Sequence, residues 1–299
     1  MASIRSEMAG VAGRAPRLLD EAFGMVHDFL WGQVNSDGAF WDREGRGNIY
    51  DTMFGLQALT ALKAELPSRV VEKYLAGLGT GEGLDLRGLT SLVGCYWLLG
   101  GVANMKRGVR DGLIERLKTF VAGDGGFHVV PGAATGSMSG NFLGVGALDD
   151  LEMPGDTVVN MTAVARSVEA LRVGDGSYGH EKELPLGNTA STAAAMILAR
   201  RLGRPMAKGS VEWLKARGHR QGGFFATPGG TMRDVVSTGL ALHGLWCAGV
   251  DVAVYKEATL DFLDSLWSSR GGFHGHCGDE AVDCEHTFYA LLALGHVAA

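Results

Sequence analysis

The stretch GGFHGHCGDEAVDCEHTFYALLALG (residues 271–295) contains the three parts from which the whole chain is built. Its glycine pair with an aromatic residue predicts a tight turn, and the polar segment that follows predicts a loop. Residues 283–294 form an apolar run rich in alanine and leucine, which is typical of a helix that neighbours pack on most sides. The stretch therefore predicts a turn, a loop and then a buried helix.

The same unit recurs along the chain, so the sequence is a repeat array. The turn is found as DGAFW, DGGFH, DGSYG, GGFFA and GGFHG at residues 37–41, 124–128, 175–179, 222–226 and 271–275, with a degenerate copy, GEGLDL, at 81–86. Six units of roughly 48 residues account for the 299 residues and leave no room for a second domain. We therefore expect a single domain over residues 1–299, with a flexible N-terminus over residues 1–17.

Each unit predicts two helices of different character. The helices after the turns, such as residues 50–62, 189–202 and 234–245, are apolar on most sides. The helices between them are amphipathic, with apolar residues at helical spacing and charged residues on the other face. Six buried and six half-exposed helices in alternation predict two concentric rings, an all-α α/α toroid. A linear helical solenoid is the alternative, although its units are shorter, at about 34–47 residues.

Composition and charge exclude several classes of protein. The chain has 27 Lys and Arg against 33 Asp and Glu, for a net charge of −6. It has no basic block that could neutralise several phosphates, so we expect no nucleic-acid partner. The longest uncharged run, residues 88–105, carries four glycines and predicts a buried helix rather than a transmembrane segment. Four cysteines and an N-terminus unlike a signal peptide indicate a cytoplasmic protein.

The recurrent turn before an apolar helix resembles the repeat shared by protein prenyltransferase β subunits and squalene/oxidosqualene cyclases. The resemblance extends from about residue 18 to residue 294 and implies an α/α toroid that handles an isoprenoid substrate. It also implies an active cavity inside the inner ring, near the N-terminal ends of the inner helices. For the transferases it further implies a helical partner subunit.

The last two units contain the residues most suited to chemistry. Nine potential metal ligands lie within residues 274–286, the densest such group in the chain. The resemblance implies a zinc ligand at His286, because DCEHT (residues 283–287) is similar to the D-x-x-H-T motif of the transferases. RDVVST (residues 233–238) aligns with their D-x-C motif, which retains Asp234 but has Val236 in place of the cysteine. Cys277 or His276 from the adjacent loop is then the open choice for a third zinc ligand.

Three functions follow, of which the resemblance favours the first, prenyl transfer. In that function Asp234 and His286 hold zinc, and Arg233 faces a diphosphate. The second is a cyclase that protonates an alkene, with Asp283 as the acid, His286 orienting it and Asp234 supporting the developing cation. Against it, such cyclases generally add a second helical domain. The third is a toroid that binds a prenyl chain or a protein without catalysis. The expected substrate-binding residues are Arg233, Tyr50, Phe54, Trp97, Trp246 and Tyr289.

Overall fold

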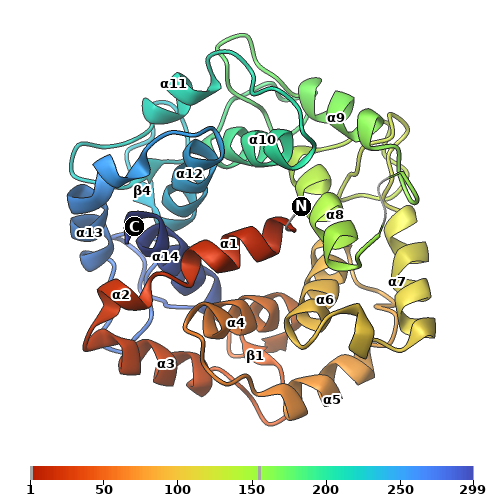
Figure 1. The fold of residues 1–299 in the computed structure, drawn as a ribbon, viewed down its shortest axis with the longest axis horizontal. Coiled ribbons are helices and arrows are strands. Elements are labelled where there is room, and N and C mark those ends of the chain that lie inside the picture. Colours follow the sequence, from red (N-terminus) through yellow and green to blue (C-terminus); the bar gives the residue numbers. More distant parts are fainter. Residues whose placement is uncertain (1–2, 154–155, 299) are drawn as a thin grey trace.

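The computed structural model describes residues 3–153 and 156–298, and its helices form two concentric rings (Figure 1). Over this part of the chain the inner ring consists of α4 (Ile49–Ala61), α6 (Leu86–Leu98), α8 (Met138–Asp150), α10 (Thr189–Arg201), α12 (Val235–Cys247) and α14 (Cys284–Val297). The outer ring consists of α3 (Ala22–Gly32), α5 (Ser68–Leu78), α7 (Arg107–Lys118), α9 (Met161–Glu169), α11 (Ser210–Lys215) and α13 (Lys256–Asp264). The predicted α/α toroid is confirmed.

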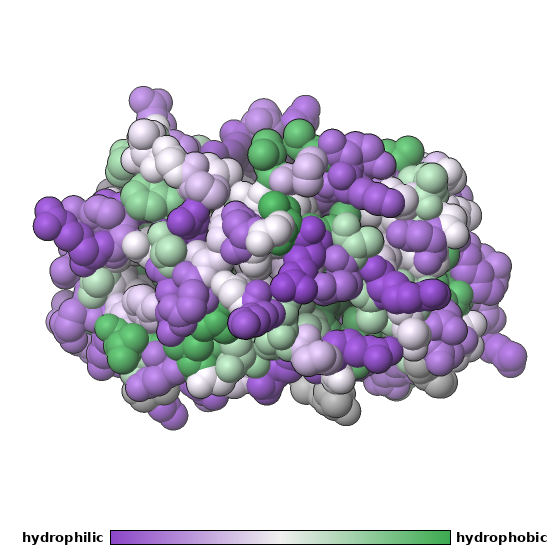
Figure 2. Space-filling model, turned by 90° about the horizontal axis from the view of Figure 1, so that it is seen from above, coloured by the Kyte–Doolittle hydropathy of each residue, from purple (hydrophilic) through white to green (hydrophobic). Residues whose placement is uncertain are grey.

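The remaining elements are short. Helix α2 (Pro16–Leu19) and the 3₁₀ helices η1 (Val102–Asn104) and η2 (Val252–Tyr255) lie in connections. Two hairpins flank inner helices: β1 (Phe40–Trp41) pairs antiparallel with β2 (Gly47–Asn48), and β3 (Phe224–Phe225) with β4 (Arg233–Asp234). No helix in the described ranges is long and apolar enough to cross a membrane. On the side seen in Figure 2 the surface is mostly hydrophilic, with hydrophobic residues scattered among polar ones.

Each clear copy of the turn is fastened to the following inner helix by the same hydrogen bond. The backbone N–H of the turn's aromatic residue donates to a side-chain oxygen in the first turns of the helix. The pairs are Phe40 with Thr52, Phe127 with Asn141, Tyr178 with Thr192, Phe224 with Thr238 and Phe273 with Thr287, at 2.8–3.3 Å. The repeat therefore conserves a structural contact between the turn and the inner helix.

The inner helices begin at side-chain caps that accept backbone N–H bonds, namely Asn48, Asp85, Ser137, Asn188, Asp234 and Asp283. Capping by Asp or Asn is the ordinary use of these residues at a helix start. First-turn residues of four inner helices, namely Tyr50, Arg87, Ser139 and Ala190, line one common pocket, so the N-terminal ends of these helices lie around it.

The ring is closed, which excludes the linear solenoid. Helix α14 packs against both α12 and α4, so the last inner helix contacts the first (Figure 1). In the outer part, the last turn packs on the first outer helix: a Cβ on Gly271 would lie 2.1 Å from the backbone oxygen of Met25 in α3. Gly271 also has a φ of 95°, which side-chain-bearing residues rarely adopt.

The N-terminal segment, which we expected to be flexible, contains helix α1 (Ile4–Ala12), and this helix lies inside the ring (Figure 1). Ile4, Met8 and Val11 are buried, and α1 contacts α14, α4 and α8. Its charged residues meet partners inside the ring, since Arg5 Nε donates to Asp150 Oδ2 at 2.6 Å. Helix α1 thus closes the ring at the C-terminal ends of the inner helices.

Candidate functional site

A cavity of about 300 Å³ occupies the centre of the inner ring. Its floor is made by Ile4, Arg5 and Met8 of α1, and the exposed Arg87 and His180 lie at its mouth. The aromatic residues of its wall are Tyr50, Phe54, Phe142, Phe288 and Tyr289. Its volume is at the lower end of the range for small-molecule sites, and such sites are mostly apolar.

Three of the residues predicted to bind substrate are part of this wall. Phe54 contacts Tyr50 edge-on, with ring centroids 5.0 Å apart, and lies 5.7 Å from the ring of Tyr289. Phe288 completes the group at 5.8 Å from Phe54. Aromatic faces of this kind attract cations.

The other three predicted substrate residues do not line this cavity. Arg233 donates to the backbone oxygens of Gln221 and Gly222, at 2.9 and 2.7 Å, and so fastens its own hairpin. Trp246 lies near the C-terminal end of α12, where Arg200 stacks over its ring at 4.6 Å. Trp97 lies close to the C-terminal end of α6.

Asp283 and His286 meet at the N-terminal end of α14, as their spacing predicts. Nδ1 of His286 lies 2.8 Å from Oδ2 of Asp283, while the other oxygen of Asp283 caps the helix by accepting from the His286 backbone N–H. Arg43, from the loop between β1 and β2, donates to Asp283 Oδ2 at 2.5 Å and to Asp279 Oδ2 at 2.8 Å. Its Nη2 also lies 2.6 Å from Nδ1 of His286. A cation from the first repeat thus completes a cluster of the last.

This cluster keeps Asp283 ionised. Burial alone would raise the pKa of Asp283, but the hydrogen bonds from His286 and Arg43 outweigh burial and hold that pKa below its ordinary value. For His286, burial would lower the pKa, yet the bond to Asp283 and its negative charge raise it. A carboxylate with a lowered pKa is poorly suited to the role of proton donor that we assigned to Asp283.

The residues present do not fit the zinc site of the transferases. The Asp234 carboxylate caps α12 by accepting from the Ser237 N–H at 2.6 Å, and Val236 offers no ligand atom. The positive group next to the His286 imidazole is the guanidinium of Arg43, whose Nη2 lies 2.6 Å from Nδ1. In the described residues, the predicted set of Asp234 and His286 with Cys277 or His276 does not bring three ligand atoms within 4.8 Å of one another.

Two further carboxyl groups near the cavity, those of Glu285 and Asp51, have raised pKa values, in contrast to the lowered pKa of Asp283. The Tyr50 hydroxyl donates to Glu285 Oε1 at 2.6 Å, and Arg87 lies over the Tyr50 ring at 5.0 Å. Burial raises the pKa of Glu285, an effect that the bond from Tyr50 only partly offsets. Burial also raises the pKa of Asp51 to about 6, even though Asn48 donates to its carboxylate at 2.8 Å.

Sequence analysis did not assign a role to Glu285, although its position carries a signal. Residues three and four apart share a helix face, so Glu285 lies on the same face as Phe288 and Tyr289. Both of these aromatic residues line the cavity. Glu285 is thus the one acidic residue of the DCEHT segment that is bonded to a cavity-lining side chain, Tyr50.

Comparison with known families gives a match over most of the chain. The model of the prenyltransferase alpha-alpha toroid domain matches residues 88–197 and 190–297. No curated protein matches the sequence significantly.

Solved structures with a similar fold include three of interest. One is a variant of the type II terpene cyclase MstE from Scytonema in complex with geranylgeranyl dihydroxybenzoate (TM-score 0.64, 14% identity, 95% of this chain and 98% of that chain). Another is Candida albicans protein geranylgeranyltransferase-I complexed with GGPP (0.61, 14%, 81% and 81%). The third is a protein from Actinoplanes (0.61, 16%, 94% and 99%). At these identities the likeness concerns the fold.

Proposed function

Because the chain belongs to the prenyltransferase alpha-alpha toroid family, we propose that it converts an isoprenoid in its central cavity. We propose further that the reaction is a cyclisation begun by protonation of a carbon–carbon double bond. The observation that carries this proposal is the Glu285 carboxyl, which is half-buried next to the aromatic cavity and held by the hydroxyl of the cavity-lining Tyr50 at 2.6 Å.

The chemistry follows from the two oxygens of Glu285. Tyr50 donates to Oε1 and fixes the carboxyl, so the acid proton resides on Oε2. Burial raises the pKa of Glu285 and so favours the protonated form that can give a proton to an alkene. The electron pair of the double bond then takes the proton, Glu285 becomes a carboxylate, and a carbocation forms. Ring closure moves the positive charge along the chain, and loss of a proton from the last cation gives an isomer of the substrate.

The cavity suits such a cation. The rings of Tyr50, Phe54 and Phe288 lie together in its wall, and aromatic faces stabilise positive charge. The Scytonema cyclase also supports the proposal, since the match covers 98% of that chain with a single toroid. The second helical domain that we expected a cyclase to need is absent from that relative.

Prenyl transfer, which the sequence favoured, is the second candidate because two basic side chains lie at the mouth of the cavity. Arg87 and His180 are placed to meet an anionic head group. The third basic residue of the lining, Arg5, is already paired with Asp150. Departure of a diphosphate needs several fixed positive charges, and without zinc ligands the site supplies few of them. Since the floor comes from the chain's own α1, we expect activity without a helical partner subunit.

Incubation in D₂O distinguishes the candidates. The purified protein is given farnesyl diphosphate, geranylgeranyl diphosphate and geranylgeranyl dihydroxybenzoate in turn, and the products are analysed by mass spectrometry. Cyclisation gives an isomer that carries one deuterium from the exchanged acid. Release of diphosphate with a thiol or arene acceptor, and without a deuterated isomer, would instead establish transfer. Binding of these compounds without conversion would instead support the third function, a toroid that binds a prenyl chain without catalysis.

A further inference from the structure

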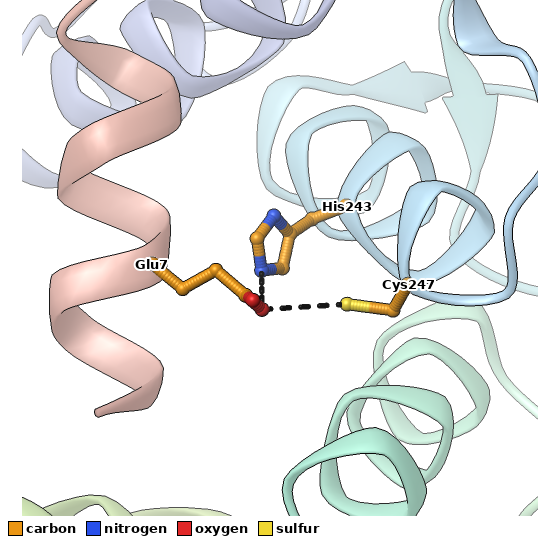
Figure 3. Close-up of side chains that lie close together, drawn as sticks. All are labelled: Glu7, His243 and Cys247. Atoms are coloured by element: carbon orange, nitrogen blue, oxygen red, sulfur yellow. Dashed lines mark hydrogen bonds and ion pairs between the residues drawn. The ribbon is translucent and has the colours of Figure 1, made fainter. Parts of the chain in front are cut away.

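A second group of potential ligands lies at the other end of the inner helices from Asp283. Glu7 is on α1, while His243 and Cys247 are in the last turns of α12 (Figure 3). Glu7 Oε1 lies 3.6 Å from His243 Nε2 and 3.7 Å from Cys247 Sγ. The ligand atoms of these three residues all lie within 4.8 Å of one another. Among the His, Cys, Asp and Glu residues in the described part of the chain, this is the one group of three that does so.

These separations are close to those in a zinc site. Tetrahedral zinc with bonds of about 2.0–2.3 Å to N, O and S places its ligand atoms about 3.3–3.6 Å apart. His243 and Cys247 are four residues apart on one helix and so share a face, and Figure 3 shows both side chains directed toward Glu7. The set of a carboxylate, an imidazole and a thiolate is one that zinc accepts.

The imidazole of His243 has an open position directed at this group. Its ring is fully buried, yet Nε2 has no hydrogen-bond partner. Nδ1 lies 3.0 Å from Nε2 of His296 in α14. With the proton on Nδ1 and donated to His296, the lone pair of Nε2 faces Glu7. A metal-bound histidine ordinarily donates its other ring N–H in this way. A buried nitrogen without a partner calls for an explanation, and a bound ion provides one.

We propose that Glu7, His243 and Cys247 bind a zinc ion that fastens α1 to α12 beneath the central cavity. The two anionic ligands offset the charge of the ion, and the thiol proton leaves when the metal binds. Arg200 binds the other oxygen of Glu7, with Nε 3.2 Å from Oε2, and so leaves Oε1 for the metal. The Glu7 side chain is 23% exposed, which gives solvent access for a water molecule as the fourth ligand.

The zinc content of the purified protein tests this proposal without reference to activity. The protein is prepared with zinc in the medium, freed of loosely bound metal by gel filtration and analysed by mass spectrometry for metals. We expect about one equivalent in the unmodified chain and a loss of at least tenfold in affinity in Cys247→Ser and Glu7→Gln. Cys277→Ser, which changes an exposed cysteine elsewhere, is the matched control and retains the metal.

Cobalt substitution supplies a second measurement, because a charge-transfer band in the unmodified chain reports a thiolate ligand directly. Added Co²⁺ should give a thiolate-to-cobalt charge-transfer band in the unmodified chain and in Cys277→Ser, and no such band in Cys247→Ser. Addition of zinc to the metal-free protein should also raise its melting temperature. A protein that takes up neither metal would overturn the proposal. So would a charge-transfer band that persists in Cys247→Ser and disappears in Cys277→Ser.

Discussion

At the N-terminal end of α14, Asp283, Glu285 and His286 are near neighbours in sequence but meet different partners. Asp283 lies against Arg43 and His286, two groups that stabilise its ionised form. Glu285 instead turns toward Tyr50 in the cavity wall, where burial favours the protonated form. The division of roles between two carboxyl groups two residues apart is thus made by their surroundings.

Replacement of Glu285 tests the acid. Glu285→Gln retains the shape and an acceptor for Tyr50 but has no acid proton, so we expect cyclisation to fall by about 100-fold or more, measured as turnover of the isoprenoid. The matched control is Glu280→Gln, an exposed glutamate in the preceding loop, which should leave turnover unchanged. An unimpaired Glu285→Gln would show that another group supplies the proton. In the unmodified enzyme, turnover should fall as the pH rises above the pKa of Glu285.

Asp51 gives a stability effect with a defined sign. Because the pKa of Asp51 is raised to about 6 in the folded chain, the native state binds this proton more tightly than the unfolded state. Its contribution to stability is therefore present below pH 4 and is lost as the pH rises to about 6. A shift of this size corresponds to about 3 kcal/mol.

Asp51→Asn removes this titration. The quantity to compare is the free energy of unfolding of the variant minus that of the unmodified chain. We expect this difference to be more favourable to the variant at pH 7.5 than at pH 4, by up to about 3 kcal/mol. Urea denaturation at the two pH values measures the difference. A gap that does not change with pH would contradict the raised pKa, and Asp264→Asn on the exposed face of α13 serves as the control.

At the scale of elements, α1 is held inside the ring by charge as well as by apolar packing. The Asp150 side chain is fully buried at the end of α8 and pairs with Arg5 Nε at 2.6 Å. Removal of one partner of a buried ion pair leaves the other charge buried and unpaired. Asp150→Asn should therefore lower the free energy of unfolding by about 3–5 kcal/mol.

The comparison for Asp150 is an ion pair at the surface. Glu115→Gln breaks the exposed pair between Glu115 and Lys118 and should cost less than about 1 kcal/mol. Combining Asp150→Leu with Arg5→Met removes both buried charges and should recover much of the stability lost in Asp150→Asn. Equal costs for Asp150→Asn and Glu115→Gln would mean that the buried pair does not hold α1.

Local periodicity predicted the repeats, the rings and the contact of Asp283 with His286, because each depends on residues close in sequence. The position of α1 could not be predicted in this way, since Arg5 finds its partner 145 residues away. The same holds for Arg43, which reaches Asp283 across 240 residues. The missing cysteine at Val236 did indicate from sequence alone that the transferase zinc site is incomplete.

For the whole molecule, closure of the ring depends on a glycine where the two ends of the repeat array meet. The turn at Gly271 packs on the backbone of α3, the first outer helix, and a Cβ there would lie 2.1 Å from the Met25 oxygen. Gly222 makes the same kind of approach between consecutive repeats. A Cβ added there would lie 1.6 Å from the backbone oxygen of Ala258 in α13. The contact that closes the ring is therefore built like the contacts within it.

Gly271→Ala tests closure. The variant combines an unfavourable positive φ with a clash against backbone that cannot move without shifting α3, so we expect a loss of several kcal/mol in free energy of unfolding. Gly229→Ala is the matched control, because Gly229 also has a positive φ, of 72°, but a Cβ there meets no atom within 4 Å. The control should cost only about 1–2 kcal/mol. If urea denaturation gave the same loss for both variants, the approach of Gly271 to α3 would not be what holds the ends of the array together.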